Sequence, residues 1–236
     1  MRFGMNREGS PEPPVEPVGW ERVREFVVSD VERPATPTRA RITWGPRAIR
    51  VPKGGKNDRV LAPCAYVATS ARPLPVSVPP AGGPELTLFE DTDATRLLCY
   101  VGEPQEGGGE RRHPVHDGDG RLIGTLRRVS PRRPFRHTWA IDQPGRPSVV
   151  GRNEWIAGGS PKDALSRAAG RFALGVVDSL ASLGAEGGDQ PAKPRTLEWR
   201  AGDEVVMLSA GSEKVTVQAE WVDRRLAFAF ALLGDH

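Results

Sequence analysis

Five arginines fall within ten residues of the sequence, and no acidic residue lies among them: Arg127, Arg128, Arg132, Arg133 and Arg136. Guanidinium groups pair bidentately with phosphate oxygens, so a segment of this kind is suited to an anionic ligand such as a phospholipid headgroup. We expect residues 127–136 to form a loop, and the competing interpretation is that its arginines are only solvated. Phe135 is the one aromatic residue among them, too few for a stacking platform, so nucleic acid is the less favoured partner.

A second group with chemical potential is the pair His113 and His116, followed directly by Asp117. The spacing of the two histidines occurs in metal sites, but Pro114 prevents a helix interior and no third ligand accompanies them. A hydrolase or metal enzyme around these three residues is therefore the weakest of three hypotheses. No catalytic residue, metal or cofactor is expected, because nucleophile elbows, Cys/His pairs and nucleotide-binding glycine fingerprints are missing from the sequence.

The segment 117–120 reads Asp-Gly-Asp-Gly, which has the composition of a calcium loop. If Gly120 were the loop glycine, the first and last ligand positions would be Val115 and Leu126, and neither side chain can coordinate a cation. A tight hairpin turn, in which the two glycines supply positive φ, explains the segment better.

The C-terminal segment has no polar side chain from Leu226 to Leu233, so each of its faces must be enclosed. Strict alternation of large and small residues fits a strand, but the absence of β-branched residues favours a helix. We expect a buried helix over 223–233, with Asp223 as N-cap and Gly234 as a left-handed C-cap. Its length of roughly 16 Å would be enough to fill a small β-barrel.

Around this helix the sequence predicts many short strands separated by glycine and proline turns, which is typical of a β-barrel or sandwich. The expected strands cover residues 25–31, 39–44, 60–70, 85–89, 95–102, 115–126 as a hairpin, 136–142, 148–151, 196–199, 205–209 and 215–221. Residues 47–59 are expected to be a basic loop and 104–112 a mobile connection. The one amphipathic pattern predicts a surface helix over 160–183, within an insertion ending at Gly184.

The first 17 residues are polar and rich in proline, so we expect a disordered leader without a signal peptide. It contains two PxxP spacings, for which a flexible leader is the favoured interpretation over a ligand motif. The remaining residues, 18–236, are expected to form a single domain in the cytoplasm. Cys64 and Cys99 lie in apolar runs and are expected to be buried, with a disulfide the less favoured alternative. The net charge is only +3, and the large excess of arginine over lysine resembles a GC-rich, actinobacterial-type genome.

Three motifs in order carry a resemblance to a known family: Asp-x-Asp-Gly-Arg-Leu-Ile-Gly-Thr-Leu at 117–126, Trp-x-Ile-Asp-x-x-Gly at 139–145 and Asp-Arg-Arg-Leu-Ala-Phe-Ala at 223–229. Over roughly residues 60–236 the chain resembles the tubby C-terminal-like superfamily, which includes LURP-one-related proteins and phospholipid scramblases. The resemblance implies a closed antiparallel barrel threaded by a hydrophobic C-terminal helix. Tubby domains bind phosphoinositide headgroups through Lys and Arg, whose positions do not match this chain one by one. The cysteine-rich run of scramblases is missing here.

Together these observations predict a mainly β protein, a closed barrel around a buried C-terminal helix with one surface helix. The first functional hypothesis is a non-enzymatic module that binds an anionic ligand through the five arginines, at a membrane surface or on a partner. The second is a protein–protein scaffold that uses the helix 160–183. The scaffold would have a protein partner, and the module would be cytoplasmic with a peripheral membrane contact.

Overall fold

The computed structural model of the chain describes residues 13–36, 39–55, 57–68, 83–129, 138–153, 196–212 and 214–234. The first twelve residues of the expected leader and the expected surface helix 160–183 lie outside these ranges. The described part is mainly β-structure, with one short helix near the C-terminus. Among the described residues no helix is long and apolar enough to cross a bilayer.

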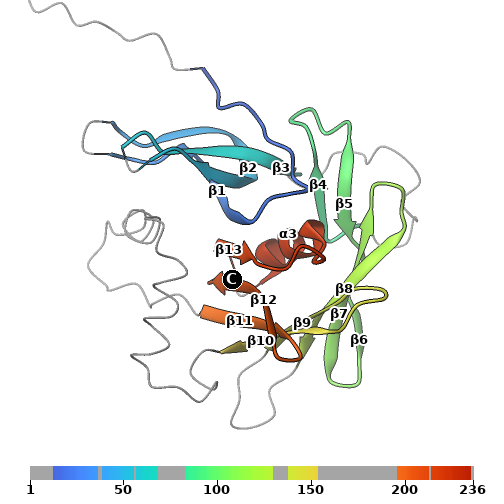
Figure 1. The fold of residues 1–236 in the computed structure, drawn as a ribbon. Coiled ribbons are helices and arrows are strands. Elements are labelled where there is room, and N and C mark those ends of the chain that lie inside the picture. Colours follow the sequence, from blue (N-terminus) through green and yellow to red (C-terminus); the bar gives the residue numbers. More distant parts are fainter. Residues whose placement is uncertain are drawn as a thin grey trace, which may run out of the picture.

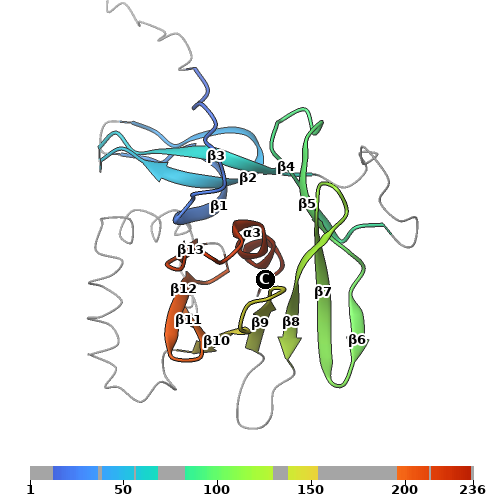
Figure 2. The same cartoon turned by 45° about the vertical axis from the view of Figure 1, so that its right-hand side comes forward.

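The strands pair antiparallel in a closed barrel (Figures 1 and 2). Twelve strands follow one another around it in the order β5-β4-β3-β2-β1-β13-β12-β11-β10-β9-β8-β7, and β7 pairs back with β5. A thirteenth strand, β6, pairs with β7 outside the closed circle. The strands are β1 (Glu25–Arg33), β2 (Ile42–Lys53), β3 (Val60–Val67), β4 (Leu86–Phe89), β5 (Leu97–Val101), β6 (Gln105–Gly107), β7 (Glu110–Asp117), β8 (Leu122–Val129), β9 (Thr138–Asp142), β10 (Val149–Asn153), β11 (Thr196–Ala201), β12 (Glu204–Ala210) and β13 (Lys214–Val217).

The helix α3 (Arg224–Leu233) confirms the prediction of a helix rather than a strand for the apolar C-terminal run. Asp223 caps it as predicted, because its carboxylate accepts a hydrogen bond of 2.9 Å from the backbone N–H of Arg225. The predicted left-handed cap at Gly234 is wrong, since its φ is −58° and its ψ 177°. Glycine is needed there for space: a Cβ atom would lie 2.5 Å from Cβ of Ser212.

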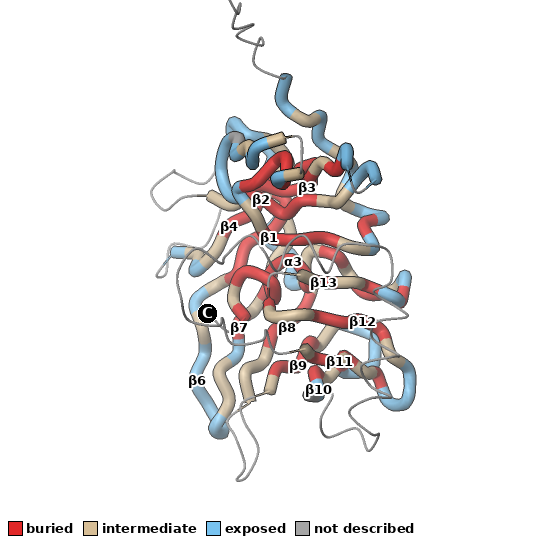
Figure 3. The backbone as a smooth tube through the Cα atoms, turned by 90° about the vertical axis from the view of Figure 1, so that its left-hand side faces the viewer, coloured by how far each residue is buried: buried red, intermediate tan, exposed pale blue. Residues whose placement is uncertain are grey.

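The apolar side chains of α3 contact aromatic rings from strands that are far apart in the barrel order. Phe228 meets Phe26 of β1 edge to face, with 4.8 Å between ring centroids. Phe230 meets Trp199 of β11 at 4.4 Å and Trp139 of β9 at 5.9 Å. Leu226 to Leu232 are all buried, and Figure 3 shows buried residues along α3 and along the strands. Offset and edge-to-face ring pairs of this kind add to the stabilisation from buried area.

Three segments expected to be loops contain strand. Strand β2 continues through the first half of the basic segment 47–59 to Lys53, and β8 includes Arg127 and Arg128. The connection 104–112 is the hairpin β6–β7, whose two-residue turn is formed by Gly108 and Gly109, both at positive φ. A Gly-Gly pair is a hairpin signal, which the surrounding glycine and charged residues obscured.

The turn at 117–120 is a hairpin as predicted, but only one of its glycines has positive φ. Gly120 has a φ of +82°. Gly118 is required for a different reason, because a Cβ atom at this position would overlap the backbone carbonyl oxygen of Leu97 in β5. The close approach of two backbones therefore selects glycine here, and no left-handed conformation is involved.

The last residues of the expected disordered leader lie against the strands instead. The backbone N–H of Val15 donates to Glu32 at 2.7 Å, and that of Val18 donates to the carbonyl oxygen of Pro63 at 2.9 Å. Both bonds join the segment to the β1–β3 part of the barrel, so the leader expected over 1–17 is too long by its last five residues. Hydrogen bonds from the few available N–H groups hold this part in place despite its proline content.

Both cysteines are buried and free, as the sequence favoured. Burial raises the pKa of the Cys64 thiol to about 12 and raises the pKa of Cys99 as well. A thiol with a raised pKa is a poor nucleophile at neutral pH, so both residues act as small apolar side chains of the core.

Candidate functional site

The two strands that flank the predicted basic segment, β8 before it and β9 after it, pair with each other. Val129, the last residue of β8, pairs with Thr138, the first residue of β9. Arg132, Arg133 and Arg136 fall between these two residues in the sequence and lie outside the described residues. The two described arginines of the candidate set, Arg127 and Arg128, are the residues of β8 directly before Val129.

Arg127 is engaged by two carboxylates from neighbouring strands. Its Nε donates to Asp142 at 2.5 Å and its Nη1 donates to Glu110 at 3.0 Å. The hydrogen bond to Asp142 raises the pKa of Arg127, although burial opposes this. Burial alone would raise the pKa of Asp142, but hydrogen bonds from Arg127 and Ser148 outweigh it and lower that pKa. Arg127 therefore ties β7, β8 and β9 together.

Arg128 has a different environment. Its guanidinium carbon lies 5.8 Å from the centroid of the Trp139 ring, which belongs to its cross-strand partner in β9. On the other side, Arg128 pairs in register with Arg111 of β7. This contact places the positive charge of Arg128 over the face of an indole ring, which is a favourable cation–π arrangement.

The pairing of β7 with β8 places arginines opposite one another twice. Arg111 faces Arg128, and Arg112 faces Arg127. Directly opposed like charges destabilise a sheet unless acids offset them. For Arg112 and Arg127 the offset comes from Glu110, which approaches both to 3.4 Å or less. Arg111 lies 3.4 Å from Glu106 and 3.9 Å from Glu85. Four arginines of β7 and β8 are thus grouped where the basic segment joins the barrel, and nearby acids partly offset their charge.

The structure separates the three residues of the metal hypothesis by their contacts. His113 is buried, and its Nδ1 lies 2.6 Å from Glu85. The ring of His116 stacks on Tyr100, with 4.9 Å between centroids, and burial lowers its pKa against the effect of Asp117. Asp117 accepts backbone hydrogen bonds within its own turn. Within the described ranges no three His, Cys, Asp or Glu side chains form a group suited to a metal ion.

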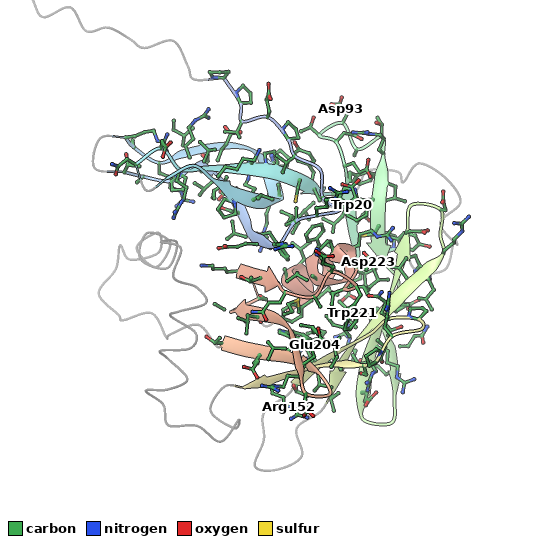
Figure 4. The ribbon with its side chains drawn as sticks, in the orientation of Figure 1. Trp20, Asp93, Arg152, Glu204, Trp221 and Asp223 are labelled. Atoms are coloured by element: carbon green, nitrogen blue, oxygen red, sulfur yellow. The ribbon has the colours of Figure 1, made fainter. Side chains whose placement is uncertain are left out.

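A hollow of about 310 Å³ lies near the opposite end of β8 and was not predicted. Strand β8 has eight residues, so roughly 24 Å separate its first residue, after the turn 117–120, from the basic end. Six residues supply the polar and aromatic groups of its wall: Trp20, Glu90, Thr95, Asp117, Asp119 and Arg225. Figure 4 labels Trp20, Trp221 and Asp223, which lie near the N-terminus of α3.

The groups around the hollow are largely tied to one another. Trp20 Nε1 donates to Glu90 at 3.1 Å. The guanidinium carbon of Arg225 lies 5.2 Å from the Trp20 ring centroid, and its Nε and Nη2 donate to Asp223 at 3.0 and 2.7 Å. Three carboxylates and one guanidinium line the hollow, so it disfavours an anion. Its wall comes from separate parts of the chain, and no local sequence pattern could have indicated it.

No protein-family model, curated protein or solved structure matches the chain. Function must therefore be inferred from the residues of the chain and their geometry.

Proposed function

We propose that the chain is a non-enzymatic, tubby-like binding module for an anionic ligand, a phospholipid headgroup or another phosphate. The ligand site is the basic end of the barrel, defined by Arg111 and Arg128 together with Arg132, Arg133 and Arg136 of the adjoining segment. The observation that carries this proposal is the double pairing of arginines across β7 and β8, at the point where a segment with three more arginines begins. Arg127, the fifth residue of the predicted set, contributes by holding the strands together.

We further propose that α3 is the central helix of the barrel. The burial of every residue from Leu226 to Leu232 and the ring contacts with β1, β9 and β11 support this arrangement. A barrel filled by a helix has no interior space for a ligand, so recognition must take place at an end or on the outer surface. The sequence resemblance to tubby-like proteins agrees with such a barrel.

The expected strength of membrane binding follows from the number of arginines. Each Arg near an anionic surface contributes about 1 kcal/mol, so three contribute about 3 kcal/mol, or roughly 150-fold in affinity. Because the net charge of the whole chain is only +3, this attraction has to come from a local group. Salt shortens the screening length, so binding must weaken as ionic strength rises.

Sedimentation with vesicles tests the proposal. Phosphatidylcholine vesicles with and without phosphatidylserine are compared at low and high salt, using the wild-type chain and R132Q/R133Q/R136Q. The matched control is R22Q/R96Q/R121Q, which removes the same charge from three exposed positions near the hollow end. We expect binding to anionic vesicles at low salt, a loss of about 100-fold in the first variant and little change in the control. Absence of binding at low salt, or equal losses in the two variants, would contradict the lipid form of the proposal.

Two further arms of the experiment separate the sources of phosphate. Competition by soluble inositol phosphate indicates headgroup recognition, whereas competition by duplex DNA with a steep salt dependence indicates a nucleic acid. The scaffold alternative, with a protein partner bound by the helix 160–183, predicts a pull-down that is lost when that segment is deleted. The third alternative, a hydrolase or metal enzyme at His113, His116 and Asp117, is disfavoured by the separate contacts of these residues.

A further inference from the structure

The proline-rich leader contains a short extended segment, residues 13–18, that is held by buried charges. Glu32 and Arg33, at the end of β1, are 1% and 8% exposed and form an ion pair of 2.8 Å. Each also bonds to the segment: Glu32 Oε1 accepts from the Val15 N–H at 2.7 Å, and Arg33 Nη2 donates to the Pro13 carbonyl oxygen at 2.7 Å. The ion pair therefore binds one acceptor and one donor of the segment at the same time.

A third bond extends this contact along the segment. The N–H of Val18 donates to the carbonyl oxygen of Pro63 in β3, at 2.9 Å. Within residues 13–17 only Val15 and Glu16 have an N–H, because the other three are prolines. The Val15 donor is the one that Glu32 uses, and the Glu16 N–H has no hydrogen bond among the described residues. The site therefore binds two groups that a proline-rich segment still offers, the Val15 N–H and the Pro13 carbonyl oxygen.

The binding groups are positioned by irregular pairing of β1 with β2. The register shifts between Ser29 and Val31, and again between Val31 and Arg33, interrupt the alternation of β1. The neighbouring side chains of Glu32 and Arg33 are therefore both buried. Below them Arg50 is buried and donates to the carbonyl oxygens of Ser29 at 3.0 Å and Leu61 at 3.2 Å. The position of the Glu32–Arg33 pair is therefore set by the barrel.

The segment itself has little apolar contact with the barrel, whereas the site that binds it favours being occupied. Pro13, Pro14, Glu16 and Pro17 are exposed, so little apolar area holds the segment in place. The pair Glu32–Arg33, in contrast, is buried and loses a charge-assisted hydrogen bond on each side when the segment leaves. The segment contributes to the burial of this pair, so water would enter on its departure, and the two charge-assisted hydrogen bonds favour an occupied site.

We propose that Glu32, Arg33 and Pro63 form a recognition site for an extended proline-rich peptide, and that residues 13–18 are its exchangeable occupant. The same segment of a second copy of this chain fits the site equally well. The PxxP spacing Pro14/Pro17 then belongs to a ligand for the chain's own barrel. This inference is independent of the anion site, which lies in a different part of the chain.

A labelled peptide with the sequence of residues 13–20 tests the proposal by fluorescence anisotropy on the full chain. In a V15P chain the tethered segment loses the N–H that Glu32 binds, so the peptide should occupy the site. In the wild-type chain and in the matched control E16P, the tethered segment competes at millimolar effective concentration. We expect the V15P chain to bind the peptide at least about tenfold more tightly than either of the other two.

The peptide itself supplies the second comparison. A peptide carrying the same V15P change should bind none of the three chains, whereas one carrying E16P should behave as the wild-type peptide. Equal binding to all chains, no binding to the V15P chain, or equal binding of the two altered peptides would overturn the proposal. The melting temperatures of the V15P and E16P chains are the control. If they lie within a few degrees of each other, the two changes have the same effect on the fold.

Discussion

The two ends of strand β8 use arginine in different ways. Near the hollow, Arg224 is buried and donates to the backbone carbonyl oxygens of Val23 at 2.6 Å, Ala219 at 3.2 Å and Val222 at 2.5 Å. Arg225 beside it is bound by Asp223. Near the basic segment, Arg128 lies over an indole ring and opposite a second arginine. The first end uses guanidinium groups to join chain segments, and the second also places arginines opposite one another across β7 and β8.

This difference shows why the presence of arginines alone does not locate a ligand site. A guanidinium group with three backbone acceptors, or with a bidentate carboxylate, has its hydrogen-bonding capacity already engaged. Arg224, Arg225 and Arg127 all belong to this class. The residues that remain as candidates for binding an external anion are those whose charge the barrel itself offsets least.

The largest effect is expected from the helix that both ends share. F230A removes a side chain that is 1% exposed and contacts Trp139 and Trp199, so it should lower the free energy of unfolding by about 3–5 kcal/mol. L233A, at a half-buried position of the same helix, is the control and should cost less than half as much. Chemical denaturation measures both values. A small cost for F230A would contradict the proposed placement of α3 at the centre of the barrel.

The contrast between Arg224 and Arg225 predicts the next largest effect. R224Q removes the guanidinium that donates to the buried carbonyl oxygens of Val23, Ala219 and Val222, and we expect a loss of about 2–4 kcal/mol in unfolding free energy. R225Q breaks a pair with Asp223 whose side chains are 19% and 18% exposed, but it keeps the backbone N–H that Asp223 caps, so it should cost less, about 1 kcal/mol. Urea denaturation measures the unfolding free energy of both variants. Equal losses would show that the backbone hydrogen bonds of Arg224 stabilise the fold no more than the ion pair of Arg225.

The next prediction compares a glycine in the turn 117–120 with a glycine in the β6–β7 turn. G118A, at the hollow end, forces a Cβ against the carbonyl oxygen of Leu97 and should destabilise the fold by about 1–3 kcal/mol. G109A, in the β6–β7 turn, meets no atom within 4 Å, and its cost of about 1 kcal/mol comes only from positive φ. Thermal melting gives the order of the two. A larger effect at Gly109 would contradict the close approach at Gly118.

The smallest effect concerns pH at the basic end. The folded pKa of Asp142 lies below its unfolded value of about 3.9, so its contribution to stability is present above pH 4 and is lost as the pH falls through the folded pKa. R127Q removes the largest of the causes that lower the pKa of Asp142 and leaves the hydrogen bond from Ser148. Melting temperatures between about pH 5 and pH 2.5 should fall less steeply in R127Q than in wild type. The exposure of Asp142 limits the effect, and R121Q, which leaves the pair intact, should follow the wild type.

Parts of this structure could be predicted from sequence because they depend on local composition. The apolar run after Asp223 had to be enclosed, and helix-forming residues with a capping aspartate specified a helix. The β6–β7 hairpin was missed because three glycines among charged residues have the composition of a flexible connection. Arg127 and Arg128 were expected in a loop, since their pairing with Asp142 and Trp139 depends on strand register. The hollow could not be predicted at all, because Trp20 and Arg225 meet only through the closed barrel.

Hydrogen–deuterium exchange with anionic vesicles tests the difference between the two ends most directly. Deuterium uptake is measured in peptides that cover residues 126–139, at the basic end, and 90–97 and 117–121, at the hollow. We predict slower uptake at the basic end, reversed by high salt, and no change around the hollow. Slower uptake around the hollow, or no change at either end under conditions where the chain sediments with the vesicles, would contradict the assignment of the anion site.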